Sequence, residues 1–240
     1  MIHSIAPTGK RFRTLALASL AGVALCGFFV AKIPVKPELA AVSAAFVLVF
    51  AYPSYSAVVN KLGWKRGALG LALLGLYALV LETVAVKSGV PYGRFSYGPK
   101  IGALLFHAVP WTVPFSWTPL VLWARTLSGK RSVLATAALM LAADLALDPG
   151  AVAQGFWRYD AGGAYYGVPL SNFAGWILSG GVGAWLATRL LGPAEAGLPL
   201  ALSGLLSLTF WTSVCLWMGL WIPGFAGILL VGGTLWQTRK

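Results

Sequence analysis

Charged side chains are scarce in this chain: they make up 10% of its 240 residues, while 58% are hydrophobic. Soluble proteins average about 25% charged residues. This composition excludes an ordinary soluble domain and predicts a protein with several membrane-spanning helices. Cysteine is also rare, and Cys26 and Cys215 both lie in apolar segments, so we expect buried thiols and no disulfide framework.

Acidic residues are the scarcest charged group, at six against 18 Lys and Arg, and the formal net charge is +12. Such an excess can indicate nucleic-acid binding. The basic residues here form no stripe, however, and stand between apolar runs, where membrane topology requires them. We therefore expect no nucleic-acid partner and contact with membrane lipid instead.

Apolar segments long enough to cross a bilayer, which takes about 20 residues, recur along the chain. There are eight candidates, at residues 14–31, 39–59, 67–86, 103–125, 132–148, 171–190, 199–219 and 221–237. The last is the weakest because it is short and barely separated from the seventh, so seven spans stay possible. The sequence predicts an all-α, polytopic transmembrane bundle that forms one integral membrane domain over residues 1–240.

Basic residues are distributed unevenly between the two sides of this layout. The richer side holds Lys10, Arg11, Arg13, Lys61, Lys65, Arg66, Arg125, Lys130, Arg131, Arg189, Arg239 and Lys240. Cytoplasmic loops are the ones enriched in Lys and Arg. We therefore predict that both termini are cytoplasmic and that the number of spans is even.

Two aspartates stand four residues apart in an otherwise apolar segment, Asp144 and Asp148. Helical spacing places them on one face, one turn apart. A charged side chain at mid-bilayer costs about 2.5–3.5 kcal/mol even on lenient scales, so we expect a function there. The structural alternative is a helix-end pair, with Asp148 reaching interfacial water, Asp144 bonded to a neighbouring helix and Pro149 ending the helix.

Other polar residues gather near the same, outer side. Glu82 lies near the end of the third span, His107 near the start of the fourth and Asn172 at the start of the sixth. Each has a structural alternative: an ion pair of Glu82 with Lys87, a satisfied polar group for His107, and a helix cap for Asn172.

Two outer loops, residues 89–99 and 155–169, mix Gly and Pro with aromatics. We expect them to fold back over the helix ends as an ordered lid. The Trp and Tyr residues of the chain are mostly a membrane-interface belt by default. A minority near the acids can line a pocket, and we name Tyr92, Tyr97, Trp111, Trp157, Tyr165 and Tyr166 as candidate substrate-binding residues, together with Asn172.

The acidic set suits acid-initiated chemistry on a lipid-soluble polyene without a metal. A carboxyl group in an apolar cavity can stay protonated near neutral pH and can protonate an alkene. Aromatic faces would stabilise the resulting cation, and a second carboxylate would complete the acid and base pair.

Several motifs resemble the membrane-integral carotenoid hydratase family, which includes acyclic carotenoid 1′,2′-hydratases and bisanhydrobacterioruberin hydratases. The resemblance covers roughly residues 80–180, our candidate catalytic core. It rests on Glu82, the loop 92–97, Val109-Pro110, Pro114 and Trp117, Asp144 with Asp148-Pro149, residues 155–157, and above all residues 163–176, which contain Tyr-Tyr-Gly-Val-Pro-x-x-Asn-Phe-x-Gly-Trp.

The resemblance implies addition of water across the terminal C1–C2 double bond of a lycopene-like carotenoid, with no cofactor. We expect a multi-pass protein of a bacterial or archaeal cytoplasmic membrane that associates with other enzymes of the carotenoid pathway. In the predicted mechanism Asp144 or Glu82 protonates C2, and Asp148 or His107 deprotonates the attacking water.

Three other functions fit parts of the sequence. A carotenoid cyclase or isomerase would use the same protonation without water capture. An aspartate-rich prenyltransferase would use Asp144 and Asp148 for a metal, but the chain has no second Asp-rich motif. A proton-coupled transporter would also place acids in spans, although here they crowd one side.

Overall fold

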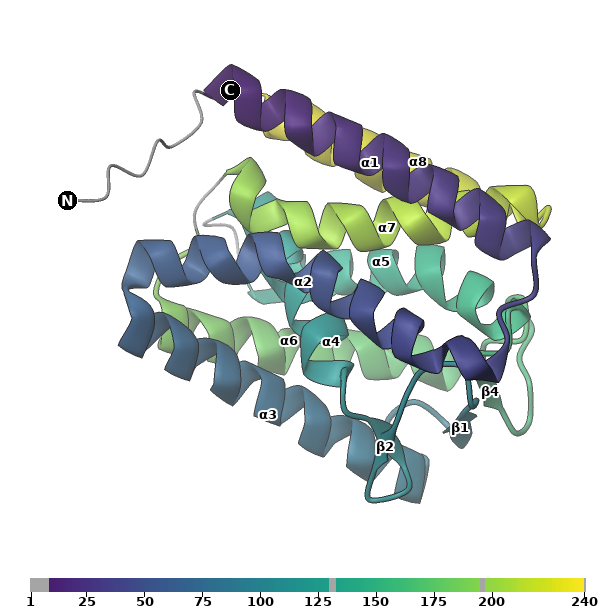
Figure 1. The fold of residues 1–240 in the computed structure, drawn as a ribbon. Helices are drawn as coiled ribbons and strands as arrows, with labels where there is room; N and C mark the ends of the chain where they lie inside the picture. The colour runs from purple at the N-terminus through teal and green to yellow at the C-terminus, as the bar shows by residue number, and fades with distance from the viewer. Residues whose placement is uncertain (1–8, 130–132, 195–196, 240) are drawn as a thin grey trace.

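The computed structural model describes residues 9–129, 133–194 and 197–239 and is an all-α bundle (Figure 1). Its helices are α1 (Gly9–Lys32), α2 (Ala40–Leu62), α3 (Trp64–Ser88), α4 (Val113–Ser128), α5 (Val133–Ala153), α6 (Leu170–Leu191), α7 (Leu198–Trp217) and α8 (Trp221–Gln237). A short 3₁₀ helix, Pro37–Leu39, leads into α2. Helices are expected because an apolar environment leaves backbone groups to satisfy one another within the segment.

Helix α7 forms the centre of the bundle and packs on α1, α2, α4, α5 and α8, while α3 packs on α2, α4 and α6. Within the described residues, five helices are long and apolar enough to cross a membrane: α1, α2 with its 3₁₀ turn, α3, α5 and α7. The predicted membrane bundle is thus confirmed as a fold class. The predicted number of spans and their orientation stay predictions.

Both ends of the described chain lie at the same end of the bundle (Figure 1). Arg13 Nη1 donates a hydrogen bond of 2.9 Å to the carbonyl of Arg239. The cytoplasmic location of these ends stays a prediction. That prediction counts Lys130, Arg131 and Lys240, which lie outside the described residues.

The predicted fourth span, residues 103–125, is wrong at its beginning. Strands β2 (Leu104–Leu105) and β3 (Val109–Pro110) form a short antiparallel hairpin there, and α4 begins only at Val113. A proline occupies the first turn of α4, which suits Pro because it has no N–H to leave unpaired. His107 therefore lies in the exposed hairpin turn, not at the head of a helix.

Helix α5 continues past Pro149 to Ala153, so the expectation that Pro149 ends the helix is wrong. A proline inside a helix leaves the carbonyl four residues earlier without its usual N–H donor. That carbonyl belongs to Leu145, and the hydroxyl of Tyr165 donates to it at 3.0 Å. Tyr165 thus supplies the missing donor, and Asp148 lies inside the helix.

Candidate active site

The two aromatic loops, residues 89–99 and 155–169, pair with each other. Strand β1 (Phe95–Tyr97) runs antiparallel to β4 (Trp157–Tyr159), with Phe95 opposite Tyr159 and Tyr97 opposite Trp157. Side chains alternate between the faces of a strand, so these four aromatics share one face. The remaining pair, on the other face, is exposed. We call this pair of strands, β1 and β4, the aromatic ribbon. It turns its aromatic face toward the helix ends.

Glu82 lies on α3 and is only 8% exposed. The hydroxyl of Tyr97 donates a hydrogen bond of 3.0 Å to Glu82 Oε2. The alternative of a surface ion pair between Glu82 and Lys87 is therefore wrong. Glu82 faces the interior and accepts its hydrogen bond from Tyr97 of strand β1.

Asp144 and Asp148 lie on one face of α5 and are joined by a shared donor. Asn172 Nδ2 donates to Asp144 Oδ2 at 2.8 Å and to Asp148 Oδ2 at 3.0 Å. Tyr159 donates to the same oxygen of Asp148 at 2.8 Å. The cap of α6 is Pro169, without a side-chain hydrogen bond, so Asn172 serves the carboxyl groups and does not cap its helix.

This polar cluster is closed to solvent: Asp144, Asp148 and Asn172 are at most 2% exposed. Asp144 Oδ1 has no hydrogen-bond partner among the described residues. Buried polar atoms in proteins almost always have a partner, so an unpaired carboxyl oxygen is unusual. An arrangement this costly to bury is typical of a functional site.

A cavity of about 140 Å³ lies against the cluster. Glu82 and Asp148 both line it, and Asp144 does not. Its walls are largely aromatic: Tyr92, Phe95, Tyr97, Trp117, Trp157, Tyr159, Trp176 and Trp211. The structure thus brings two carboxyl groups, from α3 and α5, to one apolar chamber.

Two hydrogen-bond donors of the cavity wall are unused. The hydroxyl of Tyr92 and Nε1 of Trp117 are buried and have no partner among the described residues. A small polar molecule such as water could accept hydrogen bonds from them. The cavity therefore combines an apolar interior with acids and with free donors.

The tyrosines that contact the carboxyl groups keep their protons. Burial raises the pKa of Tyr97 well above its ordinary value, and the nearby Glu82 raises it further. Burial likewise raises the pKa of Tyr159, with Asp148 and Asp144 as the next causes. Both phenols are consequently hydrogen-bond donors at any physiological pH.

Several predicted site residues do not line this cavity. His107 is exposed in the hairpin turn, and Trp111 packs edge to face on Phe115. The hydroxyl of Tyr165 donates to the α5 backbone, and the ring of Tyr166 packs edge to face on the ring of Tyr165. Of the predicted set, the structure brings together Glu82, Asp144, Asp148, Tyr92, Tyr97, Trp157 and Asn172.

Sequence reasoning missed Tyr159, which donates directly to Asp148. A signal was present, because Phe95-Ser96-Tyr97 and residues 157–159 show the same aromatic, polar, aromatic alternation. That alternation predicts a strand with one aromatic face.

No group of three or more His, Cys, Asp and Glu side chains in the described part of the chain is arranged to hold a metal ion. The Asp144 and Asp148 carboxyl groups instead share the amide of Asn172. The metal-binding segment of a prenyltransferase gains no support from this geometry.

Comparison with known proteins identifies the family. The model of the family described as carotenoid biosynthesis protein matches residues 38–234. Bisanhydrobacterioruberin hydratase from Haloarcula japonica is 39% identical over an alignment of 193 residues that covers 73% of this chain and 65% of that protein. The chain therefore spans slightly less than two thirds of this relative's length.

No solved structure matches the chain. The family match extends on both sides of residues 80–180, where the sequence motifs first indicated the resemblance, and it includes both carboxyl-bearing helices and the aromatic ribbon. The chain belongs to the carotenoid biosynthesis protein family.

Proposed function

We propose that this protein is a membrane enzyme that adds water across the terminal C1–C2 double bond of an acyclic, lycopene-like carotenoid, without a cofactor. One observation carries the proposal: Glu82 and Asp148 line the same aromatic-walled cavity of about 140 Å³. The hydratase activity named for the Haloarcula japonica relative supports it.

Glu82 is the proton donor in this mechanism. Asp144 was the other candidate, but it lies behind the cavity wall. A carboxyl group in apolar surroundings can remain protonated at neutral pH. Glu82 transfers its proton to C2, the π electrons of the double bond form the new C–H bond, and a tertiary cation remains at C1.

The aromatic wall stabilises that cation. Rings attract a cation over their faces by about 0.5–2 kcal/mol each, and more strongly where water is excluded. Trp117, Trp157 and Trp176 all line the cavity. No Lys, His or Cys among the described residues lines the cavity, so no basic nitrogen or thiol side chain competes with water for C1.

Asp148 is the base that activates water. His107, the other candidate, lies exposed in the hairpin turn, away from the cavity wall. Asp148 Oδ2 accepts hydrogen bonds from Tyr159 and Asn172, an arrangement that suits a carboxylate. Water attacks C1, Asp148 takes the released proton, and a tertiary alcohol forms. Return of that proton to Glu82 completes the cycle.

Asn172 and Asp144 position the base. The single amide group of Asn172 donates to both aspartates, so it fixes the χ angles of Asp148. The unused donors of Tyr92 and Trp117 are suited to hold the water before attack. Orientation of this kind can supply several kcal/mol of the rate enhancement.

The test is to express the chain in a lycopene-producing bacterium and to separate the pigments by liquid chromatography with mass detection. We expect a more polar product, heavier by one water, and its loss in Glu82→Gln and Asp148→Asn. Matched controls are Glu38→Gln and Asp160→Asn, because both of these acids are exposed and absent from the cavity wall.

A product of unchanged mass with a new ring or a new double-bond geometry would contradict hydration and indicate a cyclase or isomerase. A prenylated product would indicate a transferase. Unchanged pigment with well-expressed protein, for lycopene and for an elongated acyclic carotenoid alike, would refute the proposed function and leave the transporter alternative.

A further inference from the structure

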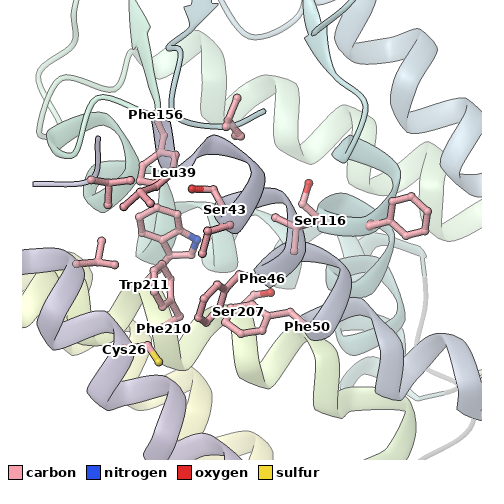
Figure 2. A pocket seen from close by; sticks show the side chains of 16 residues that line it. Cys26, Leu39, Ser43, Phe46, Phe50, Ser116, Phe156, Ser207, Phe210 and Trp211 are labelled. Atoms are coloured by element: carbon pink, nitrogen blue, oxygen red, sulfur yellow. The ribbon is translucent and has the colours of Figure 1, made fainter. Parts of the chain in front are cut away.

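A second cavity, of about 240 Å³, lies between α1, α2 and α7. Figure 2 shows the side chains that line it. Its wall is apolar and partly aromatic, with Val30, Leu39, Phe46, Phe50, Phe210 and Trp211 among the lining side chains. No charged residue of the described chain lines it. It is therefore suited to a hydrocarbon and not to a polar ligand.

The two cavities meet at a common wall. Five residues line both: Val47, Ile101, Ser116, Ser207 and Trp211. We call this set the neck. A ligand in the apolar cavity that passed the neck would reach the chamber that Glu82 and Asp148 line.

Aromatic rings continue from one cavity to the other. Phe210 contacts Trp211 with ring centroids 5.0 Å apart, Trp211 contacts Trp157 at 6.4 Å, and Trp157 contacts Tyr97 at 6.0 Å. Tyr97 in turn donates to Glu82. A conjugated chain lying along these rings would be directed to the proton donor.

The apolar cavity also opens to the outside of the bundle. Leu39, Val42 and Phe46 line it and are nevertheless 48%, 49% and 40% exposed. Helices α1 and α2 both pack on α7, and the cavity lies between them. In a membrane this opening faces lipid, from which a hydrocarbon can enter without crossing water.

The size of the inner chamber requires such an extension. A chamber of about 140 Å³ is close to the volume of an engineered cavity that binds benzene, about 150 Å³. It can hold the five-carbon end of a polyene and a water, but not a long chain.

We propose that the apolar cavity between α1, α2 and α7 is a lateral access channel that binds an acyclic polyene from the lipid and presents its terminal double bond through the neck. This inference rests on the proposed function for the identity of the reacting end. The binding of a polyene in the channel can be measured without any reaction.

The test measures lycopene binding to the purified full chain in detergent. Wild type, Ser43→Trp, Ser19→Trp and Glu82→Gln are incubated with lycopene and repurified, and retained pigment is compared with protein by absorbance. Ser43 lines the channel, whereas Ser19 is exposed on α1 and lines neither cavity. If Ser43→Trp does not give a monodisperse protein, Val42→Trp replaces it, because Val42 is half exposed and lines the same channel.

We expect wild type, Ser19→Trp and Glu82→Gln to retain lycopene, and the channel variant to retain at least tenfold less. Equal retention by the channel variant would overturn the inference, as would failure of the wild type to retain pigment above a detergent blank. The proposed function fails separately. If the wild type binds lycopene in this pattern but forms no hydrated product from lycopene or from an elongated acyclic carotenoid, the channel stands and the hydratase assignment falls.

Discussion

The hydrogen bond from Tyr159 to Asp148 offers a specific test of the proposed mechanism. Tyr159→Phe removes only the hydroxyl that donates to Asp148 Oδ2 at 2.8 Å. The ring would keep its contact with Phe95, whose centroid lies 5.6 Å away. The aromatic ribbon and the shape of the cavity should therefore be preserved, so the variant isolates one interaction with Asp148, the proposed base.

The expected magnitude follows from the charge of the acceptor. A hydrogen bond to a charged group contributes about 1.5–3 kcal/mol. In the proposed mechanism Asp148 is a carboxylate when it takes the proton of water. Tyr159→Phe would therefore destabilise that carboxylate by about 1.5–3 kcal/mol. Because each 1.4 kcal/mol corresponds to a factor of ten, the rate should fall by about 10- to 150-fold.

The assay is the initial rate of hydrated carotenoid formation by purified protein in detergent, at several pH values. Tyr55→Phe is the matched control, since its hydroxyl donates to the backbone of Pro114 and does not line the cavity. A rate within twofold of wild type at every pH would refute the role of Asp148 as the base.

Three further predictions concern the same site. Asn172→Asp should reduce the rate at least about 100-fold, because it replaces the amide that donates to both carboxyl groups with a third carboxyl group. The control Asn60→Asp, on the exposed surface of α2, should leave the rate unchanged. Gly175→Ala should lower the thermal stability by about 1–3 kcal/mol, because a Cβ there would overlap the Tyr92 ring. The free energy of unfolding should fall as the pH rises above 10, and it should fall less steeply in Tyr159→Phe. The reason is that burial raises the pKa of the Tyr159 phenol in the folded protein, so near pH 10 only the unfolded chain loses the phenol proton.

Two of these measurements have their own checks. Gly232→Ala controls for the glycine substitution, because a Cβ at Gly232 would meet nothing within 4 Å. Equal stability of the two glycine variants would contradict the close packing of α6 on Tyr92. A flat stability curve between pH 9 and 12 would contradict the burial of the phenols, since a buried tyrosine must favour its neutral form.

The acidic half of the site could be predicted from the sequence. The four-residue spacing of Asp144 and Asp148 fixes a common helix face, and the energetic cost of a buried acid identifies both as unusual. The structure places both on one face and shows in addition that they share one partner, Asn172. Sequence could not show that Asp144 lies behind the cavity wall, because that depends on how α5 is rotated against its neighbours.

The aromatic half depends on contacts between distant segments. Tyr97 and Tyr159 reach Glu82 and Asp148 only because residues 95–97 pair with residues 157–159, and strand pairing between distant loops is not encoded in local spacing. The predicted position of His107 is wrong for a related reason: an apolar run of the right length predicts a helix, whereas α4 begins only at Val113.

The most direct test of the account is to run the purified enzyme on lycopene in D₂O and, separately, in H₂¹⁸O. The account predicts one deuterium at C2 and one ¹⁸O in the tertiary alcohol at C1, with both labels absent in Glu82→Gln. An alcohol that carries oxygen from a source other than water, or a product without deuterium at C2, would contradict protonation by a cavity carboxyl group followed by water capture.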